Sequence, residues 1–200
     1  YERMGWTGDI TFFANSASYN METRAFLGHF LKMVELEQEH LNGAVPFFAP
    51  FPKVADRDAQ NPFLNSAGAA VWGDAATVLP MTLFRHFRDQ GLLNSHLSLM
   101  MNWVDYIYRQ DEERGGKRLW DFGFQLGDWL ALDLGIPGTV FGATDSALIA
   151  TIYYYYSASN TAKALKLCND SSATFYSKLA LEIRTALLTT YFIGDELQLS

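Results

Sequence analysis

Residues 145–192, DSALIATIYYYYSASNTAKALKLCNDSSATFYSKLALEIRTALLTTYF, carry the clearest helical pattern in the chain. Apolar residues recur at spacings of three, four and seven from Asp145 to Cys168, and again from Ser172 to Phe192. The segment between them, 169–172 (NDSS), is short and polar, and its side chains suit the first turn of a helix. We therefore predict two helices that pack as an antiparallel hairpin.

The same periodicity extends to earlier parts of the chain. Apolar stripes predict helices over Met21–Leu41 and Leu92–Gln110, and no stretch alternates apolar and polar residues over six positions as an amphipathic strand would. Two segments predict irregular loops: residues 43–68 hold four prolines, and residues 113–143 hold seven of the fifteen glycines. The fold class predicted is all-α, an array of helical hairpins forming one domain over residues 1–200 without an internal boundary.

Composition narrows the classes of function. The 200 residues are 49% hydrophobic, 15% aromatic and 18% charged, with a net charge of −7 that disfavours a nucleic-acid partner. Charged residues interrupt every long apolar segment, so no membrane span is predicted. Cys168 is the single cysteine, which excludes an internal disulfide and leaves the compartment open, the cytoplasm being slightly favoured over secretion. The four histidines lack metal-ligand spacing, so we expect neither a metal nor a cofactor.

Three Gly-Asp pairs lie beside a tryptophan: Trp6-Thr-Gly-Asp9, Trp72-Gly-Asp74 and Gly127-Asp128-Trp129. Each aspartate precedes a mostly apolar run, so we predict that each is the N-cap of a helix. If alternate helices of a hairpin array run the same way, their N-terminal ends meet on one rim, with the carboxylates and the indoles. Carboxylates accept hydrogen bonds from sugar hydroxyls and indole faces pack on pyranose C–H groups, so this rim fits a sugar. The alternative is that the aspartates only cap helices and the tryptophans only fill the core.

Glu2 is the other candidate. It lies seven residues before Asp9 in a segment whose glycines indicate a loop. A carboxyl group held near an indole and a second carboxylate has a raised pKa, as a general acid requires. The alternative is a solvated charge near a chain end.

Two further segments have plainer interpretations. At most two of the tyrosines at 153–156 can face one direction of a helix, and Asp111–Arg118 is predicted to be a solvated turn.

The sequence resembles a known family. The segment 1–9 (YERMGWTGD) is similar to the active-site motif of bacterial α-L-rhamnosidases of glycoside hydrolase family 78, which typically has Arg-Glu-Arg-Leu-Gly-Trp-Thr-Gly-Asp after Asp-Cys-Pro. Segments 18–23 (SYNMET), 71–76 (VWGDAA) and 127–131 (GDWLA) resemble further landmarks of the family in the same order. The resemblance covers essentially the whole chain and implies an (α/α)6 toroid of six helical hairpins, of which this chain would be about the first half.

The resemblance also implies roles for individual residues. Glu2 matches the general acid that protonates the glycosidic oxygen, and Asp9 matches a carboxylate that binds rhamnose hydroxyls. The indoles that line the sugar subsite match Trp6, Trp72 and Trp129. Asp74 and Asp128 adjoin those tryptophans, where they would either contact the sugar or cap helices. The family resembles inverting hydrolases, in which a second glutamate activates the attacking water.

The chain departs from the family pattern in three places. Tyr1 replaces the usual arginine, the preceding Asp-Cys-Pro is absent, and the family's general base would lie well beyond Ser200. Neither Glu182 nor Glu196 has a matching context, so neither is assigned as the base. We therefore expect the segment to contain the acid without the base, and to expose two apolar ends that make it self-associate in isolation.

The leading hypothesis is thus an enzyme, an α-L-rhamnosidase that releases terminal rhamnose with inversion, with rhamnose-containing glycosides and the remaining domains of the same enzyme as partners. One alternative is another toroidal glycosidase acting on a different sugar. Another is a non-catalytic sugar-binding or helical-repeat protein, in which the Trp–Asp pairs only bind or cap.

Overall fold

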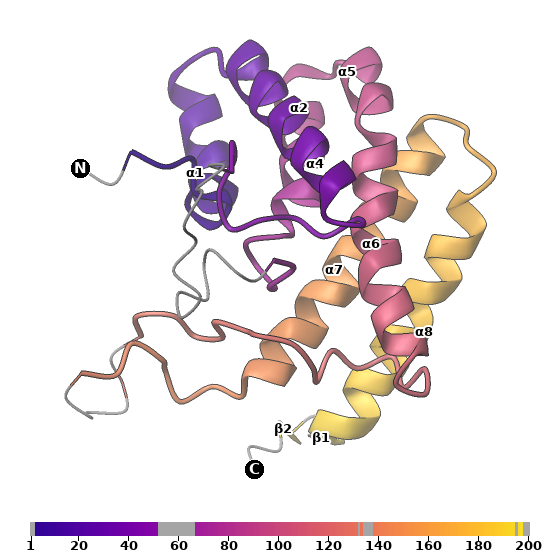
Figure 1. The fold of residues 1–200 in the computed structure, drawn as a ribbon. Coiled ribbons are helices and arrows are strands. Elements are labelled where there is room, and N and C mark those ends of the chain that lie inside the picture. The colour runs from indigo at the N-terminus through magenta and orange to yellow at the C-terminus, as the bar shows by residue number, and fades with distance from the viewer. Residues whose placement is uncertain (1–2, 52–66, 132, 134–137, 195, 198–200) are drawn as a thin grey trace.

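The computed structural model describes residues 3–51, 67–131, 133, 138–194 and 196–197. Within these residues the helices are α1 (Thr7–Asn20), α2 (Arg24–His40), α4 (Ala75–Phe87), α5 (Gln90–Ser95), α6 (Leu97–Glu112), α7 (Ser146–Leu167) and α8 (Ala173–Tyr191). A short antiparallel ribbon, β1 (Phe192–Ile193) and β2 (Glu196–Leu197), pairs Phe192 with Leu197 and Ile193 with Glu196. The prediction of a mainly helical chain is confirmed for the described residues (Figure 1).

The helices follow the predicted ranges closely. Helices α2, α7 and α8 are each shorter than predicted by a few residues at most. The predicted helix over Leu92–Gln110 is divided, because α5 ends at Ser95 and α6 begins at Leu97. The predicted hairpin is confirmed: α7 and α8 lie side by side, and the Asp170 carboxylate accepts a hydrogen bond of 2.8 Å from the backbone N–H of Ser172 in the turn between them (Figure 1).

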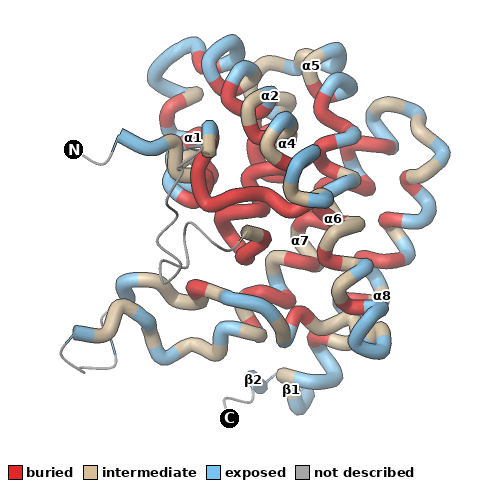
Figure 2. Tube along the Cα trace, viewed as in Figure 1, coloured by how far each residue is buried: buried red, intermediate tan, exposed pale blue. Residues whose placement is uncertain are grey.

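Helix α4 lies at the centre of the described structure. It packs against α1, α2, α6 and α7, and every residue from Ala75 to Leu83 is buried. The core around it includes Leu79, Met100, Trp103 and Tyr154, which are inaccessible to solvent. Figure 2 shows this buried interior, with exposed residues concentrated on the outer turns and loops. The central helix therefore supports the elements on several sides of it.

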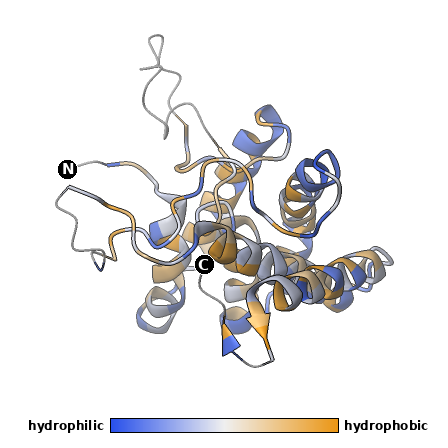
Figure 3. Ribbon diagram, turned by 90° about the horizontal axis from the view of Figure 1, so that it is seen from below, coloured by the Kyte–Doolittle hydropathy of each residue, from blue (hydrophilic) through white to orange (hydrophobic). Residues whose placement is uncertain are grey.

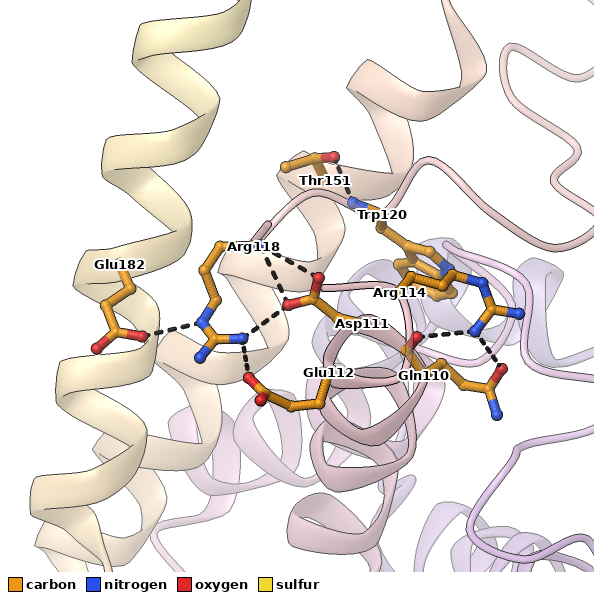
Figure 4. Close-up of polar contacts among 8 residues, drawn as sticks. All are labelled: Gln110, Asp111, Glu112, Arg114, Arg118, Trp120, Thr151 and Glu182. Carbon is orange, nitrogen blue, oxygen red and sulfur yellow. Dashed lines mark hydrogen bonds and ion pairs between the residues drawn. The ribbon is translucent and has the colours of Figure 1, made fainter. Parts of the chain in front are cut away.

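The stretch from Asp111 to Arg118 turns after the end of α6, as predicted, and residues 112–115 and 117 are exposed, but Asp111 is buried and Arg118 is half-buried. The Asp111 carboxylate accepts hydrogen bonds from the backbone N–H of Arg118 at 3.1 and 3.2 Å and from its guanidinium at 2.9 Å. The same guanidinium pairs with Glu112 at 2.5 Å and with Glu182 of α8 at 2.9 Å (Figure 4). This cluster ties the end of α6 to α8 and anchors the loop that leads to Asp128.

Large apolar side chains remain exposed at both ends of the helix array. They include Phe12, Phe13, Tyr19 and Phe26 on α1 and α2, and Phe175, Leu181 and Leu188 on α8. Figure 3 shows hydrophobic and hydrophilic residues side by side on the helices seen from below. Two exposed apolar ends agree with the sequence-based expectation, whereas self-association itself stays a prediction. In the described part of the chain, every helix is too short or too polar to cross a bilayer.

Candidate functional site

A pocket of about 960 Å³ opens where the N-terminal ends of α1, α4 and α7 meet. Its lining brings together all three tryptophans singled out in the sequence, with two of the three aspartates. The lining residues are Met4, Gly5, Trp6, Gly8, Asp9, Ile10, Phe12, Phe13, Ser16, Phe26, Phe30, Val71, Trp72, Gly127, Asp128, Trp129, Ile149 and Tyr153. The prediction that the three indoles share one surface is therefore confirmed, but only Trp6 and Trp72 lie at the start of a helix, and Asp74 is absent from the lining.

The segment before α1 is held against residues 46–49. The backbone N–H of Thr7 donates to the Phe47 carbonyl at 2.9 Å, and the N–H of Ala49 donates to the Gly5 carbonyl at 3.0 Å. A Cβ atom at Gly5 would lie 2.3 Å from the Ala49 carbonyl oxygen, so this approach requires glycine. The pairing fixes Trp6 at the mouth of the pocket, where its ring meets Phe48 edge-on at 5.1 Å.

Asp9 lies in the first turn of α1, and the predicted N-cap role is wrong. The N-cap of α1 is Trp6, so Asp9 is the third helical residue, with its side chain exposed at the pocket. A carboxylate in the first turn interacts favourably with the positive end of the helix dipole. Asp9 is therefore free to present its oxygens to a ligand in the pocket.

Asp74 differs most from its expected place, because it lies beneath the pocket and does not line it. It is the N-cap residue of α4 by position, but its side chain makes no capping hydrogen bond. Its carboxylate is completely buried and accepts hydrogen bonds from the Val71 N–H at 2.7 Å, from Trp103 Nε1 at 2.9 Å and from Ser157 Oγ. Burial raises the pKa of Asp74 to about 6, although the three hydrogen bonds act in the opposite direction.

Asp128 and Trp129 also line the pocket, and both lie on a loop. No helix begins at Asp128, so the N-cap prediction is wrong here too. The Asp128 carboxylate accepts a hydrogen bond from Thr144 Oγ1 at 2.8 Å, and its backbone carbonyl accepts one from the Gly142 N–H at 2.8 Å. The Trp129 ring packs edge-on against Phe141 at 5.7 Å. These contacts close the loop and hold both side chains at the pocket.

Several lining residues were not identified from the sequence as site residues. Ile149 and Tyr153, in the N-terminal half of α7, also line the pocket and pack against the same apolar cluster as Trp72 and Trp129. Burial raises the pKa of Tyr153, so its hydroxyl stays protonated and can donate a hydrogen bond. Phe12, Phe13 and Phe26 extend the lining along α1 and α2. Their apolar spacing marked them only as helix-face residues.

Glu2, the predicted general acid, lies outside the described residues. Its role stays a prediction, as do the ligand contacts assigned to the tryptophans and aspartates. Among the described residues, no group of three or more His, Cys, Asp or Glu side chains could hold a metal ion.

A pocket of a helical-hairpin array that is lined by indoles and carboxylates defines the class of helical domains that bind sugars, because it offers apolar faces to the sugar ring and acceptors to its hydroxyls. Comparison with known families agrees with this class. Residues 1–199 match the family described as the bacterial alpha-L-rhamnosidase 6 hairpin glycosidase domain, and the chain belongs to this family. The hairpin fold expected from the sequence resemblance is thereby confirmed.

Three relatives illustrate the similarity. The alpha-L-rhamnosidase of Streptomyces avermitilis is 34% identical over 196 residues, which are 97% of this chain and 16% of that protein. The alpha-L-rhamnosidase of Alteromonas sp. (strain LOR) is 29% identical over 197 residues, which are 97% of this chain and 20% of that protein. The crystal structure of the Streptomyces avermitilis alpha-L-rhamnosidase complexed with L-rhamnose matches with a TM-score of 0.77 at 30% identity, covering 97% of this chain and 16% of that one. The chain thus spans a fifth or less of these relatives' length.

Proposed function

We propose that this chain belongs to a glycoside hydrolase that releases terminal α-L-rhamnose from rhamnosides. The observation that carries the proposal is the pocket, which is lined by three indoles and two carboxylates and opens beside the N-terminal ends of α1, α4 and α7. Membership of the rhamnosidase domain family supports it, as does the likeness to a relative whose structure contains L-rhamnose. The volume of about 960 Å³ leaves room for a sugar together with part of the group attached to it.

The lining has a separate task for each type of side chain. The faces of Trp6, Trp72 and Trp129 would pack on the C–H groups of the sugar ring. A 6-deoxy sugar also carries an apolar methyl group, which adds to the surface that the indoles can cover. Asp9 and Asp128 would accept hydrogen bonds from the sugar hydroxyls. These contacts hold the anomeric carbon in one place relative to the segment that carries the acid.

The proposed chemistry is general acid and base catalysis with inversion. Glu2 would protonate the glycosidic oxygen as the bond to the anomeric carbon breaks, and water would attack from the opposite face. The base that removes the proton from this water would be a carboxylate roughly 6.5–9.5 Å from the acid. We propose that this base lies well beyond Ser200, in the part of the same catalytic toroid that these 200 residues do not include.

The test is hydrolysis by the natural protein that carries this sequence, with the Glu2→Gln variant alongside. The variant should lose activity strongly on an unactivated alkyl rhamnoside and much less on 4-nitrophenyl α-L-rhamnoside, whose leaving group needs little protonation. Glu113→Gln is the matched control, because Glu113 is an exposed glutamate at the far end of α6. Equal losses of Glu2→Gln on both substrates would contradict the acid role.

The two alternatives give different results in the same assay. Another toroidal glycosidase would hydrolyse 4-nitrophenyl glucosides or related glycosides faster than the rhamnoside. A non-catalytic sugar-binding protein would bind L-rhamnose with unchanged affinity after Glu2→Gln and would release no 4-nitrophenol from any of these substrates.

A further inference from the structure

Asp74 is the centre of a buried network beneath the pocket floor. Its two carboxylate oxygens accept hydrogen bonds from three segments that are distant in the sequence: the turn before α4 through Val71, α6 through Trp103, and α7 through Ser157. Thr77 extends the network, with its hydroxyl oxygen 2.7 Å from that of Ser157. A buried carboxylate with this many donors fixes the relative places of the groups that donate to it.

The donor on the pocket side is the backbone N–H of Val71, whose backbone conformation is strained. Val71 has a φ of 73°, in the left-handed region that is unfavourable for a β-branched residue. Its N–H donates to Asp74 Oδ2 at 2.7 Å, and the residue that follows it is Trp72. Because both Val71 and Trp72 line the pocket, the carboxylate holds the turn that directs the indole into it.

Close packing around Trp72 makes its place sensitive to that turn. A Cβ atom at Gly8 would lie 2.6 Å from the Trp72 ring, so the first motif of the chain touches the indole directly. A Cβ atom at Gly73 would lie 2.2 Å from the ring of Trp103, which is the network's own donor in α6. A displacement of the turn by a fraction of an ångström would therefore move Trp72 against Gly8.

The network needs a carboxylate and not an amide. The backbone N–H of Val71 and the indole N–H of Trp103 can only donate, and they contact different oxygens of Asp74. In the Asp74→Asn variant, the amide nitrogen would face one of these two donors in either orientation, leaving a buried N–H without an acceptor. Ser157 differs, because its hydroxyl can turn and accept.

We propose that Asp74 is a positioning residue of the pocket, which acts with Ser157 and Trp103 to fix the Trp72 indole against the ligand. That the ligand is a sugar rests on the proposed function. The positioning role of Asp74 does not depend on which ligand the pocket binds. Ser157 also lies one turn after Tyr153 on α7, so the same network sets the wall of the pocket beside its floor.

The test uses the natural protein labelled with 5-fluorotryptophan, in which ¹⁹F resonances are assigned by Trp72→Phe and Trp129→Phe. In the absence of sugar, Asp74→Asn should shift or broaden the Trp72 resonance and leave that of Trp129 in place. Ser157→Ala, which removes only one of the three hydrogen bonds, should give a smaller change of the same kind. The control is Thr161→Val, a shape-conserving change at another buried position of α7.

Kinetics give a second, independent measurement. Because an indole packs on the sugar in the bound state and in the transition state alike, Asp74→Asn should raise KM for a rhamnoside roughly tenfold with kcat changed less than about threefold. Thr161→Val should change neither. If Asp74→Asn does not fold, Ser157→Ala decides the question.

The outcomes separate the two proposals. An unchanged Trp72 resonance in the folded variants would overturn the positioning role, whichever sugar is bound. A shifted Trp72 resonance in a protein that neither binds nor hydrolyses rhamnosides would support the positioning role and overturn the proposed function. A fall in kcat with KM unchanged would also contradict positioning, because it would place Asp74 in the chemical step.

Discussion

Replacing Arg118 by alanine tests whether the ion-pair cluster holds the loop that leads to the pocket. The guanidinium lies between three carboxylates and over the ring of Tyr108, 4.9 Å from its centre. The side chains of Arg118 and Asp111 are 18% and 2% exposed, so this pair is the buried member of the cluster (Figure 4). Most of the stability lost in Arg118→Ala should therefore come from leaving the buried Asp111 carboxylate without its ion-pair partner.

The magnitude follows from these contacts. Removing one partner of a buried ion pair costs about 3–5 kcal/mol, and the lower end applies because Asp111 keeps the backbone N–H of residue 118. The pairs with Glu112 and Glu182 are solvent-exposed and contribute at most about 1 kcal/mol. The contact with Tyr108 contributes about 0.5–1 kcal/mol. We expect the loop to lose about 4 kcal/mol of stability against local opening.

The assay is hydrogen exchange at the backbone N–H of Trp120, which donates to Thr151 Oγ1 at 2.9 Å two residues after Arg118. A loss of 4 kcal/mol should speed its exchange about a thousandfold. Arg114→Ala is the control, because Arg114 is exposed, lies 3.9 Å from its ion-pair partner and otherwise bonds Gln110 near the end of α6 and lies 4.6 Å from the centre of the Phe122 ring. Such exposed contacts contribute about 1 kcal/mol at most, so the variant should change the rate less than about tenfold. Exchange no faster in Arg118→Ala than in Arg114→Ala would refute the reasoning.

Two further substitutions test the pocket and the core. Gly8→Ala should displace Trp72 and raise KM for a rhamnoside roughly tenfold. The control is Gly28→Ala, whose Cβ meets only the flexible Leu92 side chain at 3.3 Å and which should leave KM unchanged. Equal KM values for both variants would contradict the packing argument. His96 is buried, and burial lowers its pKa below the ordinary 6.5. The unfolded chain therefore takes up a proton first, so the free energy of unfolding should fall as pH drops below about 6.5. His96→Leu should remove this contribution, which is measured as the difference between the wild-type and variant free energies of unfolding in urea from pH 5 to about 8. Asp74, whose pKa is raised to about 6, contributes a slope of opposite sign that is common to both proteins and cancels in the difference.

The helices could be predicted from the sequence because their apolar faces are regular. In α6 the predicted stripe includes Leu97, Met100, Val104 and Ile107, and all four are buried against the core. The break between α5 and α6 could not be predicted in the same way. Apolar spacing continues across residue 96, and periodicity does not detect a change of backbone direction at a single residue.

The site was only partly predictable. The tryptophans could be identified because each lies beside a Gly-Asp pair near a predicted helix start. Tyr153 could not be chosen from four consecutive tyrosines, because only the packing of α7 decides which one faces the pocket. The partnership of Asp74 with Ser157 joins residues 83 positions apart, and no local pattern marks either as part of one network. Long-range polar contacts of this kind depend on the whole fold.

The three Trp–Asp motifs also show why similar motifs acquire different roles. Asp9 follows its tryptophan by three positions, which is almost one helical turn, and both side chains stay at the pocket. Asp74 follows Trp72 by two positions within a tight turn, so when the indole faces the pocket the carboxylate faces the core. Asp128 directly precedes Trp129 on a loop, where paired backbone contacts with residues 140–142 hold both at the wall. The offset between the two residues, together with the local backbone, thus decides whether an aspartate lines the pocket or is buried behind the indole that lines it.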